Sequence, residues 1–287
     1  MQLGLSSYSL SNEMKKGEMT IKDAIKWIAD NGGQHIEVVD YGLDLIAQNH
    51  WPDEIKALTT ELGIAVSNYA ISANIADKSE LEIKQEIDRI KLHIDIAHRM
   101  GAKLLRHDVA FRPIEQSTLK QYMSDLSLNV EVCQEIADYA AQYGIVTSIE
   151  NHGYFIQGSD RVTTLIDKVN RSNFKLTLDI GNFMCSDENS VDAVRKTLPY
   201  ASIIHLKDFY YRPSYHNPGE GWFPTANGNY LRGAILGHGD INLQEIIRMI
   251  KQSGYDGYFS VEFEGLEECK WASRVSMDNA FRIWNEN

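Results

Sequence analysis

Residues 175–182, KLTLDIGN, have the pattern of a buried β-strand that runs into a carboxylate and then a glycine. Leu176, Leu178 and Ile180 recur with a period of two, which predicts a strand. A carboxylate among such apolar neighbours is costly to bury without a partner. The stretch therefore predicts that Asp179, near the C-terminal end of its strand, has a functional partner.

Three other strand-like stretches also carry polar side chains at their C-terminal ends, and they are residues 145–151 (IVTSIEN), 202–208 (SIIHLKD) and 258–265 (YFSVEFEG). Taken singly, each polar residue has a structural explanation, such as a turn cap or a satisfied core histidine. Four such ends in succession favour a shared site, and one imidazole with three carboxylates suits Mn²⁺, Mg²⁺, Co²⁺ or Zn²⁺. We therefore predict that one divalent metal ion is held by Glu150, Asp179, His205 and Glu262.

The rest of the chain alternates short apolar stretches with amphipathic ones. Further strands are predicted over residues 2–9, 35–40, 64–71 and 102–108, and helices over 20–31, 51–62, 80–100, 119–143, 161–169, 191–198, 243–252 and 267–284. Eight strand–helix units within 287 residues predict an α/β fold, the (β/α)8 TIM barrel, as a single domain over residues 1–287. A doubly wound open sheet is the alternative, which the lack of a GxGxxG turn after the first strand disfavours.

Composition excludes several classes of protein. The net charge is −12 with no basic run, so no nucleic-acid partner is expected. The sequence has no apolar run long enough for a membrane span and no signal-peptide pattern, so no membrane association is expected. Three widely spaced cysteines without a CxxC motif indicate reduced thiols and a cytoplasmic location.

Five motifs together resemble those of a known family: residues 148–153 (SIENHG), 178–182 (LDIGN), 204–208 (IHLKD), 237–241 (GHGDI) and 260–265 (SVEFEG). They are similar to motifs of the xylose isomerase-like TIM-barrel superfamily of sugar isomerases and epimerases. That group includes ketose 3-epimerases, hydroxypyruvate isomerase, inosose isomerases and dehydratases and, more distantly, endonuclease IV. The resemblance covers essentially the whole chain and is specific for the superfamily rather than for one substrate.

The resemblance implies roles for the four predicted ligands. Glu150 and Glu262 correspond to glutamates that both bind the metal and act as the acid/base pair, whereas Asp179 and His205 correspond to the remaining ligands. The chain departs from the pattern at Asn182, where ketose 3-epimerases place a histidine that contacts the substrate. The metal site is therefore predicted more strongly than a 3-epimerase activity.

Further residues at the strand ends are candidates for substrate contact, and they are Arg106, His107, His152, Asn182, Lys207 and His238. Three of them have a simpler alternative: a solvated loop for His152, a salt bridge for Lys207, and a glycine-flanked turn for His238. Of Arg106, His107 and Asp108, which end the fourth strand, one is expected to face the pocket, and the sequence does not choose among them. Residues 209–240 form the one irregular segment, of a length that is typical of lids and binding loops.

The predicted function is metal-dependent isomerisation or epimerisation of a small polyhydroxylated ketose, aldose or inosose. A glutamate would transfer a proton through a metal-bound enediolate. One alternative is a metal-dependent dehydratase of an inosose or a dehydroshikimate-like substrate. Another is a non-catalytic sugar-binding barrel, because fold alone does not establish catalysis. The expected partner is a small-molecule carbohydrate, and a homo-oligomer is compatible with such a barrel.

Overall fold

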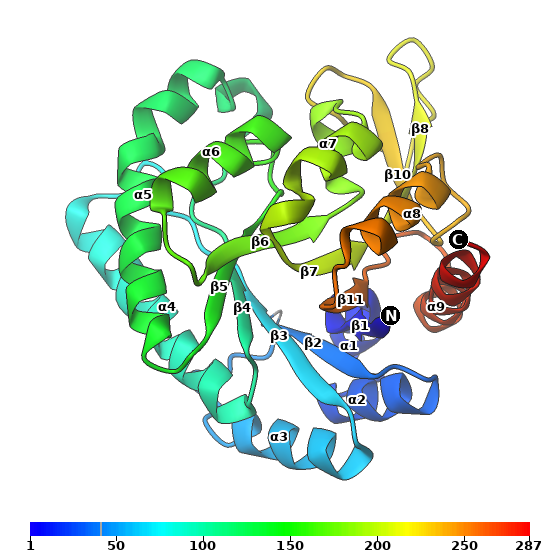
Figure 1. Ribbon diagram of the computed structural model, residues 1–287, viewed down its shortest axis with the longest axis horizontal. Helices are drawn as coiled ribbons and strands as arrows, with labels where there is room; N and C mark the ends of the chain where they lie inside the picture. The colour runs from blue at the N-terminus through cyan, green and yellow to red at the C-terminus, as the bar shows by residue number, and fades with distance from the viewer. Residues whose placement is uncertain (41) are drawn as a thin grey trace.

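Eight parallel strands close into a barrel, in the order β1-β11-β7-β6-β5-β4-β3-β2 (Figure 1). The computed structural model describes residues 1–40 and 42–287. The barrel strands are β1 (Gln2–Ser6), β2 (His35–Val39), β3 (Ala65–Ile71), β4 (Leu104–His107), β5 (Val146–Glu150), β6 (Phe174–Asp179), β7 (Ala201–Leu206) and β11 (Tyr258–Val261). The α/β barrel predicted from the alternating pattern is confirmed.

Helices surround the strands in an outer ring (Figure 1). They are α2 (Ile21–Asp30), α3 (Trp51–Leu62), α4 (Glu80–Met100), α5 (Leu119–Ala141), α6 (Ser159–Val169), α7 (Ser190–Thr197), α8 (Leu243–Ser253) and α9 (Cys269–Glu286). Local side chains set their ends. Thr20 and Asp23 form a capping box at the start of α2, and Ser79 and Glu82 form another at the start of α4. Gly101 ends α4 in the left-handed conformation with φ of 82°.

The first strand is shorter than predicted. It ends at Ser6, and the chain continues as a 3-10 helix (Ser7–Leu10) and the short helix α1 (Ser11–Lys15). The hydroxyl of Ser6 accepts the Tyr8 N–H at 3.4 Å, and the hydroxyl of Ser9 accepts the Phe263 N–H at 2.9 Å. These side chains offer the backbone partners outside the sheet, which favours a turn over a longer strand. The turn places Tyr8 in the lining of the cavity at the barrel mouth.

The segment 209–240 is more regular than the sequence predicts. With Asp208 it supplies a three-stranded antiparallel sheet in the order β8-β10-β9, made of β8 (Asp208–Arg212), β9 (Phe223–Pro224) and β10 (Tyr230–Ala234). Phe209 and Leu231 pack with Cys185 in a small buried cluster, and the rings of Phe209 and Phe223 meet edge to face at 5.7 Å. This separate apolar cluster explains why aromatic residues assigned to a loop form a sheet.

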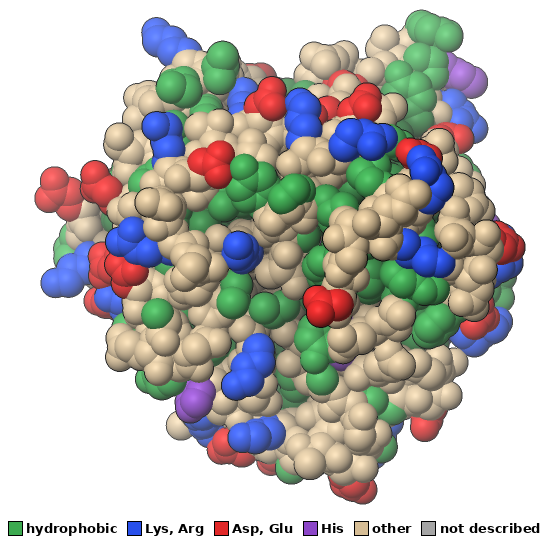
Figure 2. Space-filling view, viewed as in Figure 1, with side chains coloured by type: hydrophobic (Ala, Val, Ile, Leu, Met, Phe, Trp, Pro, Cys, Tyr) green, Lys and Arg blue, Asp and Glu red, His purple; other side chains and the backbone are tan. Residues whose placement is uncertain are grey.

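Apolar side chains fill the barrel and the layer between strands and helices. Leu176 and Leu178 of the opening stretch are fully buried, as the period of two predicts. On the face shown in Figure 2, acidic and basic side chains are interspersed rather than gathered into a basic patch. In the described part of the chain, no helix combines the length and apolarity that crossing a bilayer requires.

Candidate metal centre

Four strand ends bring the predicted ligands together. Glu150 ends β5, Asp179 ends β6, His205 lies on β7, and Glu262 directly follows β11. These strands are consecutive neighbours in the barrel, and Asp179 is paired in register with His205. One ligand atom from each residue lies within 4.8 Å of all the others, and all four residues are buried. Strand order alone therefore places three carboxylates and one imidazole at one point.

The spacing of the ligand atoms fits a divalent ion. His205 Nδ1 lies 3.8 Å from Glu150 Oε1, 3.9 Å from Asp179 Oδ2 and 3.7 Å from Glu262 Oε2. These distances are too long for hydrogen bonds, whereas ligands held at ~2.1 Å from one metal ion lie roughly 3–4 Å apart. His205 Nδ1 is buried without a hydrogen-bond partner among the described residues, whereas Asp179 Oδ2 has Lys207 Nζ at 3.0 Å. An unsatisfied buried nitrogen is costly unless a ligand satisfies it, so the donor set suits a metal.

A carboxylate on the opposite side of the barrel orients the histidine. His205 Nε2–H donates to Glu37 Oε2 at 2.8 Å, which leaves Nδ1 as the ring nitrogen that faces the other ligands. Asn68 Nδ2 donates to the same Glu37 oxygen at 3.2 Å. Metal-binding histidines commonly have such a carboxylate partner. Sequence reasoning missed Glu37, although a fully buried glutamate inside the apolar stretch HIEVV is a signal of the same kind as Asp179.

Charge around His205 prepares it to exchange a proton for a metal. Burial lowers the pKa of His205, but the carboxylates of Glu37 and Glu262 outweigh this effect and raise the pKa well above its ordinary value. A cation is therefore favoured at this position. Since metal binding displaces a ligand proton, a divalent ion would take the place of the Nδ1 proton.

The turn after β6 holds Asp179 in one orientation. Asp179 Oδ1 accepts the backbone N–H groups of Gly181 at 2.7 Å and Asn182 at 2.9 Å. The side chain of Asn151 brackets the same residue, because it accepts the Asp179 N–H and donates to the Asp179 carbonyl. A Cβ at position 181 would lie only 3.0 Å from Lys207 Cγ, so glycine permits this close approach. The second oxygen, Oδ2, is consequently directed at the ligand cluster.

Lys207 lies inside the cluster. Its Nζ is 2.6 Å from Glu262 Oε2, 3.0 Å from Asp179 Oδ2 and 3.2 Å from Glu264 Oε2. Lys207 is two positions after His205, so strand alternation directs both side chains to the same face, although β7 itself ends at Leu206. Burial lowers the pKa of Lys207, yet Asp179 and Glu262 raise it well above its ordinary value, so the side chain is an ammonium ion.

The neighbouring glutamates differ in charge. Burial raises the pKa of Glu262, but Lys207 and His205 outweigh it and hold that pKa well below the ordinary value. Burial also raises the pKa of Glu264, and there the effect of Lys207 does not compensate fully. Of the pair, Glu262 is therefore the carboxyl group that ionises more readily, as suits a metal ligand or a base.

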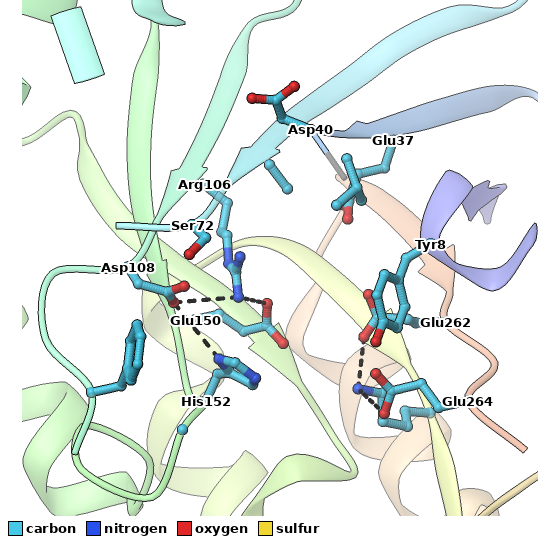
Figure 3. A pocket seen from close by; sticks show the side chains of 15 residues that line it. Tyr8, Glu37, Asp40, Ser72, Arg106, Asp108, Glu150, His152, Glu262 and Glu264 are labelled. Atoms are coloured by element: carbon cyan, nitrogen blue, oxygen red, sulfur yellow. Dashed lines mark ion pairs between the residues drawn. The ribbon is translucent and has the colours of Figure 1, made fainter. Parts of the chain in front are cut away.

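A cavity of about 310 Å³ opens in front of these residues (Figure 3). Arg106 Nη2 on one wall lies 2.9 Å from Glu150 Oε2 and 3.3 Å from Asp108 Oδ1. His152 Nδ1 is 3.9 Å from the same oxygen of Asp108, and half of the His152 side chain is exposed. Figure 3 shows Tyr8, Glu262 and Glu264 on the opposite wall. This volume lies at the small end of the range for small-molecule sites.

The structure brings some of the predicted substrate contacts to this cavity. Arg106, His152 and Lys207 line it. Asn182 lies in an adjoining recess with His152 and Lys207, where its Nδ2 donates to Glu150 Oε1 at 2.9 Å and its Oδ1 accepts from Lys207 at 3.3 Å. The side-chain amide of Asn182 thus connects Lys207 to Glu150. The lining also includes residues that sequence reasoning left unassigned: Tyr8, Glu37, Val39, Asp40, Ala70, Ser72, Phe111 and Gly153.

Two expected contacts are placed elsewhere. Among the described residues that line the cavity, neither His107 nor His238 occurs. His107 alternates with Arg106 on β4, so it is buried on the other side, near the ring of Phe174, and burial lowers its pKa to about 4. His238 is exposed in the turn after β10. The strand direction and that turn, respectively, account for where these two histidines lie, and their contact with substrate stays a prediction.

Comparison with known proteins identifies the family. The family model of the xylose isomerase-like TIM barrel matches residues 25–278, so the chain belongs to this family. The resemblance drawn from the five motifs is thereby confirmed.

Similar individual proteins are distant in sequence. The chain is 24% identical over 230 residues to an inosose dehydratase of Yersinia enterocolitica, which covers 74% of each protein. It is also 24% identical to an inosose isomerase of Halalkalibacterium halodurans, over 84% of this chain and 82% of that one. A solved structure of IOLI protein with a bound zinc atom has a TM-score of 0.76 at 17% identity, covering 100% of this chain and 99% of that chain. At this identity the structural likeness shows the fold alone.

Proposed function

We propose that this protein is a divalent-metal-dependent enzyme that isomerises or epimerises a small polyhydroxylated ketose, aldose or inosose. The observation that supports it most is the arrangement of two glutamates, Glu150 and Glu262, which enter one buried ligand cluster from different sides of a sugar-sized cavity. Relatives that bear inosose isomerase and inosose dehydratase names agree with a carbohydrate substrate.

A divalent ion held by Glu150, Asp179, His205 and Glu262 would supply Lewis-acid polarisation of a substrate carbonyl. The protein's own residues would then move the proton. Lys207 holds Glu262 ionised through a 2.6 Å contact, so this carboxylate is able to accept a proton.

Glu150 is positioned for the complementary transfer. Arg106 Nη2 contacts its Oε2, and Asn182 Nδ2 donates to its Oε1. Both contacts orient the carboxylate toward the cavity. A proton returned to the opposite face of the same carbon yields an epimer, and a proton returned to the neighbouring carbon yields an aldose–ketose isomer.

Dehydration is the second candidate, and a specific pair of residues favours it. His152 lies beside Asp108 on the cavity wall, 3.9 Å from its carboxylate. Desolvation lowers the pKa of His152, but Asp108 outweighs it and raises that pKa above its ordinary value. A protonated imidazole there would be an acid for a departing hydroxyl group, which isomerisation does not require. The relatives named inosose dehydratase are consistent with that reaction.

One experiment separates these reactions. Protein stripped with a chelator and reloaded with Mn²⁺, Mg²⁺, Co²⁺ or Zn²⁺ is incubated with ketoses, aldoses and inososes in D2O. We expect deuterium incorporation into a product of unchanged composition, detected by NMR and mass spectrometry, and only after metal is restored. A product whose mass is that of the substrate less one water would assign the dehydratase reaction. Binding without turnover for every sugar and metal would contradict the enzyme proposal and favour a sugar-binding barrel.

A further inference from the structure

The cavity in front of the predicted ligands carries an excess of negative charge. Among the described residues that line it, two side chains are permanent cations, Arg106 and Lys207, and a third basic group, His152, lies 3.9 Å from Asp108. Six lining side chains are carboxylates: Glu37, Asp40, Asp108, Glu150, Glu262 and Glu264. A divalent ion would offset only part of this excess. A ligand with a phosphate or carboxylate group of its own would therefore need a cation that is not already paired.

Arg106 is already committed to partners within the protein. Its Nη2 contacts Glu150 and Asp108, and its Nη1 donates to the Ile71 carbonyl at 3.4 Å. The remaining nitrogen, Nε, is buried and has no hydrogen-bond partner among the described residues, so it is the charge of Arg106, rather than every N–H group, that is paired. An anionic ligand would have to take Arg106 from one of its carboxylates and leave that carboxylate in the cavity without a cation. Breaking a buried ion pair in this way is strongly unfavourable.

Lys207 is committed to the same degree. Three carboxylates, those of Asp179, Glu262 and Glu264, lie within 3.2 Å of its Nζ, and the Asn182 side chain accepts at 3.3 Å. The side chain is 3% exposed. Its positive charge compensates the neighbouring carboxylates and is not free to bind an anion in the cavity.

Backbone N–H groups after the seventh barrel strand, where TIM barrels often bind phosphate, are also occupied. Asp208 Oδ2 accepts from the N–H groups of Gly237 and Gly239, each at 2.9 Å, and Oδ1 accepts from Ile241 at 3.3 Å and Phe209 at 2.9 Å. A Cβ at position 239 would collide with the Asp208 carboxylate, so glycine is required there. The motif GHGDI thus forms an anion-binding turn that an internal carboxylate fills.

The position after the eighth barrel strand is filled in the same manner. Helix α9 begins behind Glu268, whose carboxylate accepts the N–H of Lys270 at 2.9 Å and of Trp271 at 2.7 Å. A helix N-terminus would otherwise attract a phosphate. Here an acidic side chain of the chain itself occupies it.

From these contacts we infer that the site selects uncharged polyhydroxylated substrates and discriminates against their phosphorylated or carboxylated counterparts. The inference rests on the proposed function and narrows it. Hydroxyl groups can hydrogen-bond to the paired carboxylates without displacing a cation, whereas an added anion meets uncompensated negative charge. Inososes and free ketoses belong to the accepted class, and sugar phosphates and dehydroshikimate-like acids do not.

The test compares matched ligands that differ only in one anionic group. Turnover of D-fructose and D-fructose 6-phosphate is measured with the metal-loaded protein, together with a neutral inosose and an inositol-derived carboxylate. The thermal midpoint is measured with each sugar and with inorganic phosphate, on metal-loaded and on metal-stripped protein. We expect kcat/KM for the neutral member to exceed that of the anionic member by at least about a hundredfold, and we expect no stabilisation by phosphate.

The outcomes distinguish this inference from the proposed function. Equal turnover of neutral and anionic members would overturn the charge selectivity while leaving the enzyme proposal intact. If no sugar is turned over, the enzyme proposal fails, and the thermal midpoints then test the charge selectivity. A rise in the midpoint of the metal-stripped protein with phosphate or D-fructose 6-phosphate would overturn the charge selectivity, and an unchanged midpoint with both anions would agree with it.

A pair of variants tests the cause. Asp108→Asn removes one partner of Arg106, so it should strengthen binding of D-fructose 6-phosphate about tenfold relative to the wild type. Asp40→Asn removes the same charge from the same cavity without freeing Arg106, and it should change this affinity far less. Equal gains in both variants would show that Arg106 pairing is not the cause. Unchanged affinity for D-fructose 6-phosphate in Asp108→Asn would also show that Arg106 pairing is not the cause. If either variant does not fold, the thermal midpoint of the wild type with phosphate still tests the charge selectivity.

Discussion

The two halves of the barrel mouth differ in what they contribute. The half formed by β5, β6, β7 and β11 supplies all four predicted metal ligands and Lys207. The half formed by β1 to β4 supplies residues that hold those ligands: Ser6 and Glu37 contact Glu262 and His205, and Arg106 contacts Glu150. The difference teaches that reactive groups are concentrated on one side, while their charge and orientation are set from the other.

The largest effect should come from the reactive half. Glu150→Gln keeps the shape of the side chain but removes its capacity to accept a proton, so kcat should fall by about 10²–10⁴-fold. The variant should fold normally, as judged by its thermal midpoint, and should lose substrate-dependent proton exchange with solvent. Glu115→Gln, at an exposed glutamate, is the matched control and should retain activity. Full activity in Glu150→Gln would show that Glu150 takes no part in proton transfer.

Lys207→Met should mainly change stability. It leaves the buried carboxylates of Asp179 and Glu262, and the partly exposed Glu264, without their ammonium partner. This should lower the free energy of unfolding of the metal-free protein by about 3–5 kcal/mol. Added metal should restore part of the loss, because a divalent ion supplies the missing charge. Urea unfolding with and without metal measures both quantities. Lys175→Met, on the partly exposed side of β6, is the control, and equal stability of the two variants would refute the balancing role.

The supporting half should show a smaller effect on metal affinity. Glu37→Gln replaces a carboxylate acceptor by a neutral amide, which weakens the bond that orients His205, so the metal Kd should rise about 10–100-fold. Isothermal titration with the metal alone gives this readout independently of turnover. Asp40→Asn is the matched control, since Asp40 follows the same strand but makes no contact with His205 in the described structure. An unchanged metal Kd in Glu37→Gln would show that Glu37 does not orient His205 for metal binding.

The smallest expected effect concerns pH, again in the supporting half. Burial lowers the pKa of His107 to about 4, from an ordinary value near 6.5. Between these values the unfolded chain binds a proton that the folded chain does not, so stability is lost as pH falls through this range. His107→Asn should remove about 1 kcal/mol of that loss between pH 7 and pH 5.5 in metal-free protein. The same pH dependence of stability in the wild type and in His107→Asn would contradict the assignment.

The fold was accessible from sequence because its signals are local. The period of two in residues 175–182, glycines such as Gly63 and Gly101, and capping residues such as Thr20 act within a few positions of one another. Their repetition implies a parallel barrel. The segment 209–240 was the exception, since its sheet depends on a buried cluster in which Cys185 comes from outside the segment.

Within the site, sequence patterns predicted the four ligands but not the residues that orient them. Glu150, Asp179, His205 and Glu262 end successive strands, so parallel pairing already predicts that they meet. The bond between Glu37 and His205 joins residues 168 positions apart, and it exists because the barrel closes. The placement of His107 and His238 away from the cavity also required strand direction and turn geometry, which spacing alone does not specify.

Sequence by itself therefore determined the barrel, the family and the four residues that form the candidate metal centre, because periodicity and strand order act through local rules. Only the tertiary structure decided that Lys207 pairs with three carboxylates, that Glu37 and Arg106 reach the cluster from across the mouth, and that Asp208 fills the glycine turn. The physical reason is that charge compensation is a property of groups brought together by barrel closure. The same closure places Lys207 beside Asp179, the carboxylate at the end of β6.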